Sequence, residues 1–129
     1  MSVSAAAMAV PFGSQSVLVI EDDTGKVLLE KNADRVVSIA SLTKLMTAMV
    51  VLDAKQDMDE TIAIDRRDVD TLKHSTSRVP VGAKITRRDV LHLALMSSDN
   101  RAAASLARTF DGGPVGFKAA VRAKIRALG

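Results

Sequence analysis

Residues 42–52 constrain the fold of this chain more than any other segment. Eight of these eleven residues are apolar, and the three polar ones are Thr43, Lys44 and Thr47. At 100° per residue, the three polar side chains fall within an arc of about 100°. The pattern predicts a helix from Ser41 to Asp53 that is buried around most of its circumference and exposes one narrow polar face.

The segments around this helix predict a mixed α+β architecture. Two short aliphatic runs, residues 16–21 and 26–30, enclose an Asp/Gly turn, which is typical of a β-hairpin. We expect a short extended segment at residues 61–64 and a short helix at residues 66–73. The hairpin and the buried helix together indicate one small domain.

Three further helices are expected in the second half of the chain. Thr86 and Asp89 fit a capping box, in which Thr86 accepts from a backbone N–H and Asp89 reaches back, and this box opens a helix through Met96. A second helix runs to about Thr109, and a third covers residues 114–128. The basic residues of the third are expected to form a solvated face: Lys118, Arg122, Lys124 and Arg126.

Composition excludes several classes of function. The chain has no cysteine, so it has neither a disulfide scaffold nor a thiolate metal site. Its 18 basic residues are interleaved with 15 acidic ones and aromatic residues are 2% of the chain, which makes nucleic-acid binding a weak interpretation. No apolar run approaches the ~18–20 residues of a membrane span. His74 and His92 stand alone, so we expect neither a metal site nor a Ser-His-Asp triad that uses either of them.

Ser41 and Lys44 lie three residues apart at the start of the predicted helix, which places them on one face. A serine needs a base to become a nucleophile, and a buried lysine can serve as one. At a helix start, the serine N–H is also free to donate to a developing oxyanion. However, 11 serines and 8 lysines give about 0.7 chance matches to this spacing. Lys44 could equally be a surface lysine on the polar face.

Ser98-Asp99-Asn100 adds a second constellation. With 11 serines and 2 asparagines, only about 0.17 chance matches to Ser-x-Asn are expected. The tripeptide lies in a predicted turn between two helices, where it could face a cleft. Ser-x-x-Lys followed by Ser-x-Asn matches two of the three signatures of penicillin-recognising serine enzymes.

Three longer segments carry a family resemblance: SIASLTKLMTAMVVLDA, DVDTLKHSTSRVPVG and LHLALMSSDNRAAASLAR. With them, the chain resembles low-molecular-mass penicillin-binding proteins of the D-alanyl-D-alanine carboxypeptidase/endopeptidase family, in particular the penicillin-binding protein 7 group. The resemblance implies that Ser41 forms an acyl-enzyme, Lys44 is its base, Ser98 passes a proton to the leaving amine and Asn100 binds substrate. It implies no metal or cofactor, peptidoglycan stem or cross-link peptides as substrates, β-lactams as covalent inhibitors, and a periplasmic or cell-envelope location.

The resemblance also sets limits on the fold. It implies an N-terminal hairpin plus a helical subdomain of the penicillin-binding protein/β-lactamase-like transpeptidase fold, with the C-terminal strands missing. The third signature, Lys-Thr/Ser-Gly, is absent, so we expect impaired activity, and self-association through the exposed strand edge. Residues 1–14 would be a flexible N-terminus or signal-peptide remnant, and residues 15–129 a partial serine D-Ala-D-Ala peptidase domain.

Two alternatives remain open. A fragment of a class A-type β-lactamase would share both Ser-x-x-Lys and Ser-Asp-Asn. A non-catalytic module could bind the cell wall or a partner protein on a degenerate peptidase scaffold.

Overall fold

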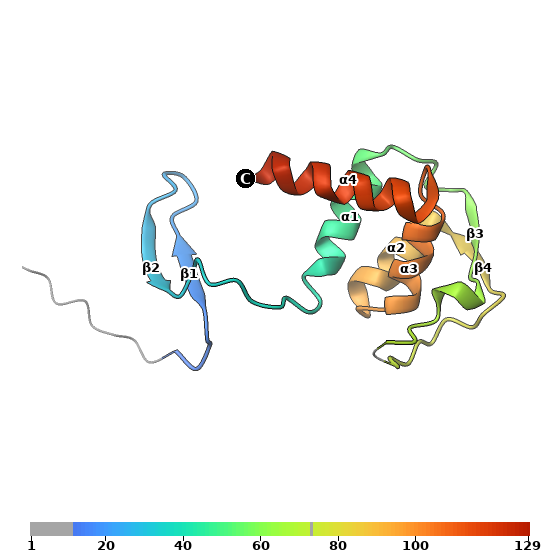
Figure 1. Ribbon diagram of the computed structural model, residues 1–129, viewed down its shortest axis with the longest axis horizontal. Helices are drawn as coiled ribbons and strands as arrows, with labels where there is room; N and C mark the ends of the chain where they lie inside the picture. Colours follow the sequence, from blue (N-terminus) through green and yellow to red (C-terminus); the bar gives the residue numbers. More distant parts are fainter. Residues whose placement is uncertain (1–11, 73) are drawn as a thin grey trace, which may run out of the picture. The chain divides into compact units, whose positions relative to one another are not determined.

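The computed structural model describes residues 12–72 and 74–129 in two units, which are divided between Ser38 and Ile39 (Figure 1). Each unit is described by itself. Most of the expected flexible N-terminus or signal-peptide remnant, residues 1–14, lies outside the described residues.

The first unit is the predicted β-hairpin. Strands β1 (Val17–Ile20) and β2 (Val27–Lys31) pair antiparallel, with an irregularity between Val19 and Ile20. The turn between them is closed by the Gly25 N–H, which donates to the Glu21 carbonyl at 2.8 Å. Gly25 has a φ of 68°, a left-handed conformation that glycine adopts without steric cost.

The second unit joins four α-helices to one small sheet. The helices are α1 (Thr43–Asp53), α2 (Arg87–Met96), α3 (Asn100–Arg108) and α4 (Gly113–Leu128). Strands β3 (Thr61–Ala63) and β4 (Lys84–Thr86) pair antiparallel, and the short 3₁₀ helix η1 (Arg66–Asp68) follows β3. Helices α2 and α3 lie side by side, and α4 contacts both α1 and α3 (Figure 1).

Two local predictions differ from the structure. The helix expected at residues 66–73 is limited to the single turn η1, because the backbone of Val69, directly after it, is extended. The cap of α2 is also different in detail. Thr86 Oγ1 accepts from the Asp89 N–H at 3.1 Å as expected, but the Asp89 carboxylate bonds the Thr86 hydroxyl at 2.7 Å rather than its backbone. Thr86 is also the last residue of β4 and pairs with Thr61.

The hydrophobic core of the second unit lies among α1, β3, α2 and α3. Its most buried members include Val51, Ile64, Val90 and Leu106. Helix α1 is less buried than its pattern alone predicts, since Leu42, Leu45 and Leu52 are exposed.

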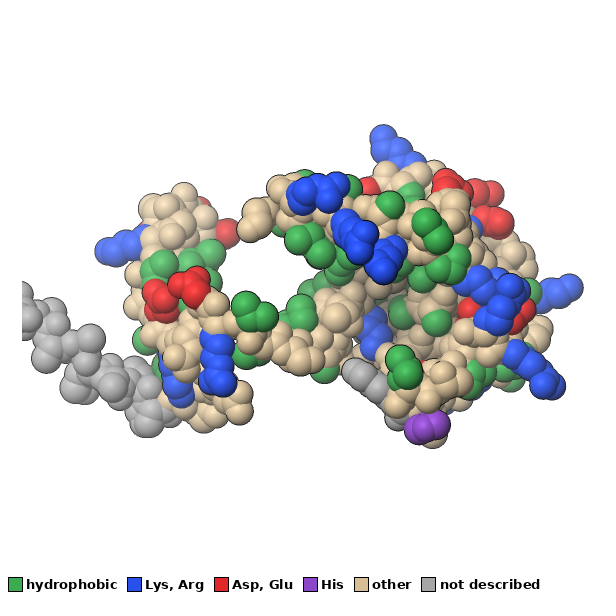
Figure 2. Space-filling model, in the orientation of Figure 1, with side chains coloured by type: hydrophobic (Ala, Val, Ile, Leu, Met, Phe, Trp, Pro, Cys, Tyr) green, Lys and Arg blue, Asp and Glu red, His purple; other side chains and the backbone are tan. Residues whose placement is uncertain are grey.

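Helix α4 packs by one side, where Phe117, Ala120 and Val121 are partly buried against the core. Phe117 meets Phe110 edge-to-face, with ring centroids 5.6 Å apart. Basic side chains gather over α4 on the face seen in Figure 2. Lys118, Arg122 and Arg126 are exposed as predicted, whereas Lys124 is partly buried and pairs with Asp53 at 2.5 Å.

Candidate active site

Ser41 lies in the turn that leads into α1. The Ser41 carbonyl accepts from the Lys44 N–H at 3.0 Å, which closes a turn just before the helix. The Ser41 side chain is exposed, and among the described residues no acceptor is bonded to its backbone N–H. This N–H sits at a helix start, where the backbone dipoles favour negative charge.

Ser98, Asp99 and Asn100 form the junction between α2 and α3. Asp99 is buried, and its carboxylate caps α3 by accepting from the Ala102 N–H at 2.9 Å. Ser98 has a φ of 51°, a left-handed conformation that is uncommon for a residue with a Cβ. The cap and this backbone conformation fix where the two flanking side chains point.

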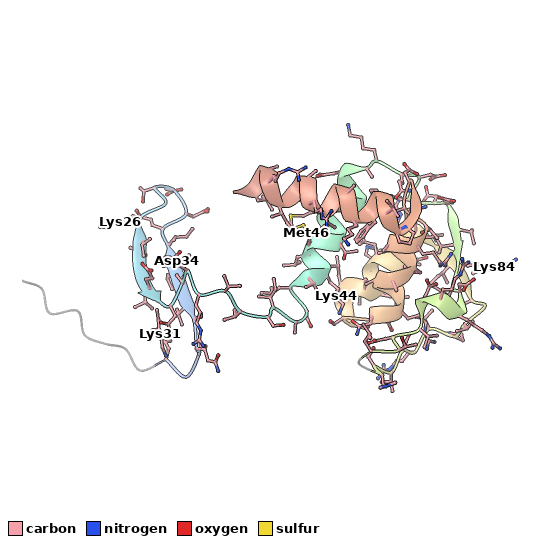
Figure 3. The ribbon with its side chains drawn as sticks, viewed as in Figure 1. Lys26, Lys31, Asp34, Lys44, Met46 and Lys84 are labelled. Carbon is pink, nitrogen blue, oxygen red and sulfur yellow. The ribbon has the colours of Figure 1, made fainter. Side chains whose placement is uncertain are left out.

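The structure brings together all four residues that the sequence singled out. Ser98 Oγ and Ser41 Oγ are hydrogen-bonded at 2.8 Å. Lys44 Nζ donates to Asn100 Oδ1, and Figure 3 shows Lys44 projecting from α1 toward the start of α3. Within the described part of the chain, no hydrogen bond joins the side chains of Lys44 and Ser41 to each other. The nucleophile candidate therefore contacts the second serine, and the lysine contacts the asparagine.

These side chains line a cavity of about 490 Å³ in the second unit. It is bounded by residues from α1, from the start of α3 and from the loop after η1, including Ser41, Lys44, Asp70, Leu72, Ser98 and Asn100. A cavity of this size holds a small peptide segment or a drug-sized ligand. It has hydroxyl groups and a cation on one wall and a carboxylate on another.

Asp70 and Ser75 belong to this site, and reasoning from the sequence did not find them. Asn100 Nδ2 donates to Asp70 Oδ2 at 2.9 Å and to Ser75 Oγ at 3.0 Å. Both residues lie in a polar stretch without periodicity. No spacing rule links such a loop to a tripeptide 25–30 residues away, so only the folded structure identifies them.

The loop that carries Asp70 is anchored by buried charge. Asp68 is fully buried and accepts from Arg108 Nε at 2.7 Å and Nη2 at 2.8 Å. The hydrogen bond and charge of this carboxylate raise the pKa of Arg108 above its ordinary value. At the start of η1, hydrogen bonds from the Arg67 side chain and backbone N–H hold the pKa of Asp65 well below its usual range. The first residues of this loop are therefore tied to the end of α3.

The described residues offer no group of three or more His, Cys, Asp or Glu side chains arranged to hold a metal ion. None of their helices is long and apolar enough to cross a membrane. The site combines the hydroxyl groups of three serines with the amino group of a lysine, the amide of Asn100 and the carboxylate of Asp70. Such a set can activate a serine and move its proton.

The sequence matches a family model over residues 2–129, and the description of that family is D-alanyl-D-alanine carboxypeptidase, peptidase S11. A D-alanyl-D-alanine endopeptidase of Pseudomonas aeruginosa is 55% identical over 116 residues, which cover 90% of this chain and 37% of the relative. A D-alanyl-D-alanine endopeptidase of Escherichia coli is 47% identical with the same coverage. The chain thus spans a little over a third of the length of these relatives.

Solved structures give the same picture of the fold. The penicillin-binding protein PBP3 of Streptococcus pneumoniae, described as a peptidoglycan synthesis regulatory factor, has a TM-score of 0.78 and 31% identity. The likeness covers 92% of this chain and 34% of that one. Penicillin-binding protein D2 of Listeria monocytogenes, in its ampicillin-bound form, has a TM-score of 0.75 and 31% identity over 93% of this chain and 48% of that one. These likenesses confirm the predicted α+β fold class.

Proposed function

The chain belongs to the D-alanyl-D-alanine carboxypeptidase family, peptidase S11, and from this membership we propose that it acts as a serine-type D-Ala-D-Ala peptidase on peptidoglycan peptides. The membership confirms the family expected from the three matching segments. The activity, substrate and location of the whole protein are proposals, because the chain covers 37% of its curated relatives.

One observation carries the proposal. Ser41 Oγ and Ser98 Oγ are 2.8 Å apart although 57 residues separate them in the sequence. Lys44, one turn along from Ser41, is held at the same cavity wall by Asn100. A chance Ser-x-x-Lys on a solvated helix face has no reason to meet Ser-x-Asn across a cavity. The meeting supports Ser41 as the nucleophile, Lys44 as its base and Ser98 as the proton shuttle.

The proposed reaction has two steps. Ser41 Oγ attacks the carbonyl carbon of the D-Ala-D-Ala peptide bond, the C–N bond breaks, and the serine proton passes by way of Lys44 and Ser98 to the departing amine. Water then attacks the ester, which releases the acid and restores the Ser41 hydroxyl. The Ser41 backbone N–H at the start of α1 would stabilise the developing oxyanion, and Asn100 would bind the substrate peptide.

The substrates we propose are peptidoglycan stem or cross-link peptides, at a site in the cell envelope or periplasm. A β-lactam would acylate Ser41 in the place of the peptide. We also propose self-association through the hairpin, since Leu18, Ile20 and Leu28 are exposed there.

Mass spectrometry of the intact chain after prolonged treatment with fluorescent penicillin tests this function. We expect one covalent adduct on the unmodified chain and none on Ser41→Ala. A Ser105→Ala variant is the matched control, because Ser105 is buried in α3 and its hydroxyl donates to the Ala102 carbonyl at 2.8 Å. It should form the adduct. An adduct that persists in Ser41→Ala, or none on the unmodified chain, contradicts the proposal. Rapid release of hydrolysed penicillin would instead favour the β-lactamase alternative.

A further inference from the structure

We propose that Asp70 is a positioning residue, which orients the Asn100 amide so that its carbonyl oxygen faces Lys44. The inference rests on the proposed function, in which Lys44 and Asn100 serve the Ser41 reaction. It concerns the loop after η1, which the two sequence signatures do not include.

The orientation follows from the hydrogen-bonding capacities of the three groups. A lysine ammonium can only donate, and a carboxylate can only accept. Asn100 bridges them, with Oδ1 accepting from Lys44 and Nδ2 donating to Asp70 Oδ2 at 2.9 Å. A flipped amide would place its NH₂ against the ammonium and its oxygen against the carboxylate. The contact between the amide oxygen and the carboxylate would be repulsive whether Lys44 is an ammonium or the neutral amine that acts as a base, so only one orientation satisfies the bridge.

The second amide proton is also used. Asn100 Nδ2 donates to Ser75 Oγ at 3.0 Å, and Ser75 Oγ donates to Asp70 Oδ2 at 2.7 Å. The three side chains therefore form a closed set of hydrogen bonds. Ser75 supports the arrangement but cannot define it, because a hydroxyl both donates and accepts.

Asp70 is held independently of Asn100. Its Oδ1 accepts from the Leu72 N–H at 3.1 Å, an Asx-type turn that fixes the carboxylate on its own loop. Two residues earlier, the buried Asp68 is bound by Arg108 at 2.7 and 2.8 Å. The position of the Asp70 carboxylate is thus fixed by bonds that do not involve Asn100, as a positioning group requires.

The bridge also keeps two opposite charges apart. With the Asn100 amide between them, the Lys44 ammonium meets a neutral carbonyl dipole rather than the Asp70 carboxylate. Direct pairing would draw the lysine toward the loop and away from the wall that carries Ser41 and Ser98. Without Asp70, the side-chain amide of Asn100 could rotate. Without Asn100, the Asp70 carboxylate could pair directly with the Lys44 ammonium.

The first test measures the rate of penicillin acylation of Ser41 in a double-mutant cycle of Asp70→Ala and Asn100→Ala. We expect Asp70→Ala to slow acylation roughly ten- to hundredfold, since misplacing one catalytic group costs this much. In the Asn100→Ala background the same change should have little further effect. Asp59→Ala, which removes an exposed aspartate paired with Arg88, is the matched control and should acylate normally. Asp70→Asn keeps the side-chain size, so it carries the test if Asp70→Ala does not fold.

The second test is independent of activity. The chain has two asparagines, Asn32 and Asn100, so selective ¹⁵N-asparagine labelling gives two side-chain NH₂ pairs. We expect Asp70→Ala to shift the Asn100 pair and speed its exchange with water, while the Asn32 pair stays unchanged.

The outcomes distinguish the positioning role of Asp70 from the proposed peptidase function. An Asn100 pair that does not move in Asp70→Ala, or Asp70 and Asn100 effects on acylation that simply multiply, would overturn the positioning role. An Asn100 pair that moves as expected, in a chain that penicillin never acylates, would support the orientation by Asp70 and refute the peptidase function.

Discussion

Ser98 adopts a backbone conformation that its side chain disfavours. At a φ of 51° its Cβ approaches the following carbonyl, which costs about 1–2 kcal/mol relative to glycine. Strain of this kind persists where surrounding structure enforces it, often at functional sites. Here it occurs at the residue whose hydroxyl meets Ser41.

Two substitutions of Ser98 should therefore differ in their effect on stability but have the same effect on activity. Ser98→Gly removes the hydroxyl and the strain, whereas Ser98→Ala removes only the hydroxyl. We expect the glycine variant to be more stable than the alanine variant by about 1 kcal/mol, while both lose most penicillin acylation. Urea unfolding followed by circular dichroism measures the first effect. Equal stabilities would show that the left-handed conformation carries no strain.

At the scale of the elements, the three-residue helix η1 is capped by charged side chains. Asp65 accepts from the Arg67 N–H at 2.8 Å and from the Arg67 guanidinium at 2.9 and 3.0 Å. These bonds lower the pKa of Asp65 in the folded state, chiefly through the side chain of Arg67. The Asp65 carboxylate therefore binds a proton less readily in the folded state than in the unfolded state.

The sign of the pH dependence follows from this lowered pKa. Ionised Asp65 contributes its full stabilisation above the ordinary carboxyl pKa of 3.8, and the contribution is lost as the pH falls toward the folded-state pKa. We expect Asp65→Asn to be less stable than the unmodified chain at pH 7 and the difference to shrink steadily below about pH 4. Unfolding curves of both chains between pH 7 and pH 3 measure it. A difference that grows on acidification would contradict the assignment.

At the scale of the whole molecule, Arg87 joins separate segments of the second unit. It is 1% exposed and donates to the Asp57 carbonyl, Gln56 and Glu60 in the loop before β3. It also donates to the carbonyl and hydroxyl oxygens of Thr109, just after α3. A single buried side chain thus holds the start of α2, a distant loop and the end of α3 together.

Replacing Arg87 should weaken the whole fold. We expect Arg87→Met to lower the free energy of unfolding by about 2–4 kcal/mol, because the buried guanidinium makes five part-buried hydrogen bonds that the methionine cannot replace. The neighbouring Arg88 is 53% exposed and pairs with Asp59, so Arg88→Met should change stability by about 0.5 kcal/mol or less. Thermal and urea unfolding of the two variants compare them directly. Similar effects for both would mean that the buried network adds nothing.

Local signals in the sequence were enough for most elements. The Asp/Gly turn predicted the hairpin, Thr86 predicted the start of α2, and the apolar run at residues 42–52 predicted α1. The two signatures also supplied Ser41, Lys44, Ser98 and Asn100 as site candidates. Each of these features depends only on neighbouring residues or on a short spacing in the sequence.

What the sequence did not predict depends on distant partners. The extended segment expected at residues 61–64 is β3, but its partner β4 was not expected, because β4 has three residues and about 20 residues separate the two strands. The places of Asp70 and Arg87 are decided by bonds to residues 30 and 22–31 positions away. Polar side chains in such segments look like solvated loop residues until the chain has folded.

The buried cap of α3 changes how the tripeptide Ser98-Asp99-Asn100 should be read. Its middle residue faces the interior and holds the helix end, while its two neighbours face the cavity. In a survey of variants scored by activity, Asp99 would therefore appear as essential as the residues that touch substrate. Replacements able to cap a helix, such as serine, threonine and asparagine, should be the ones tolerated. The middle position of Ser-x-Asn, which the motif leaves variable, is constrained in this chain because Asp99 must cap α3.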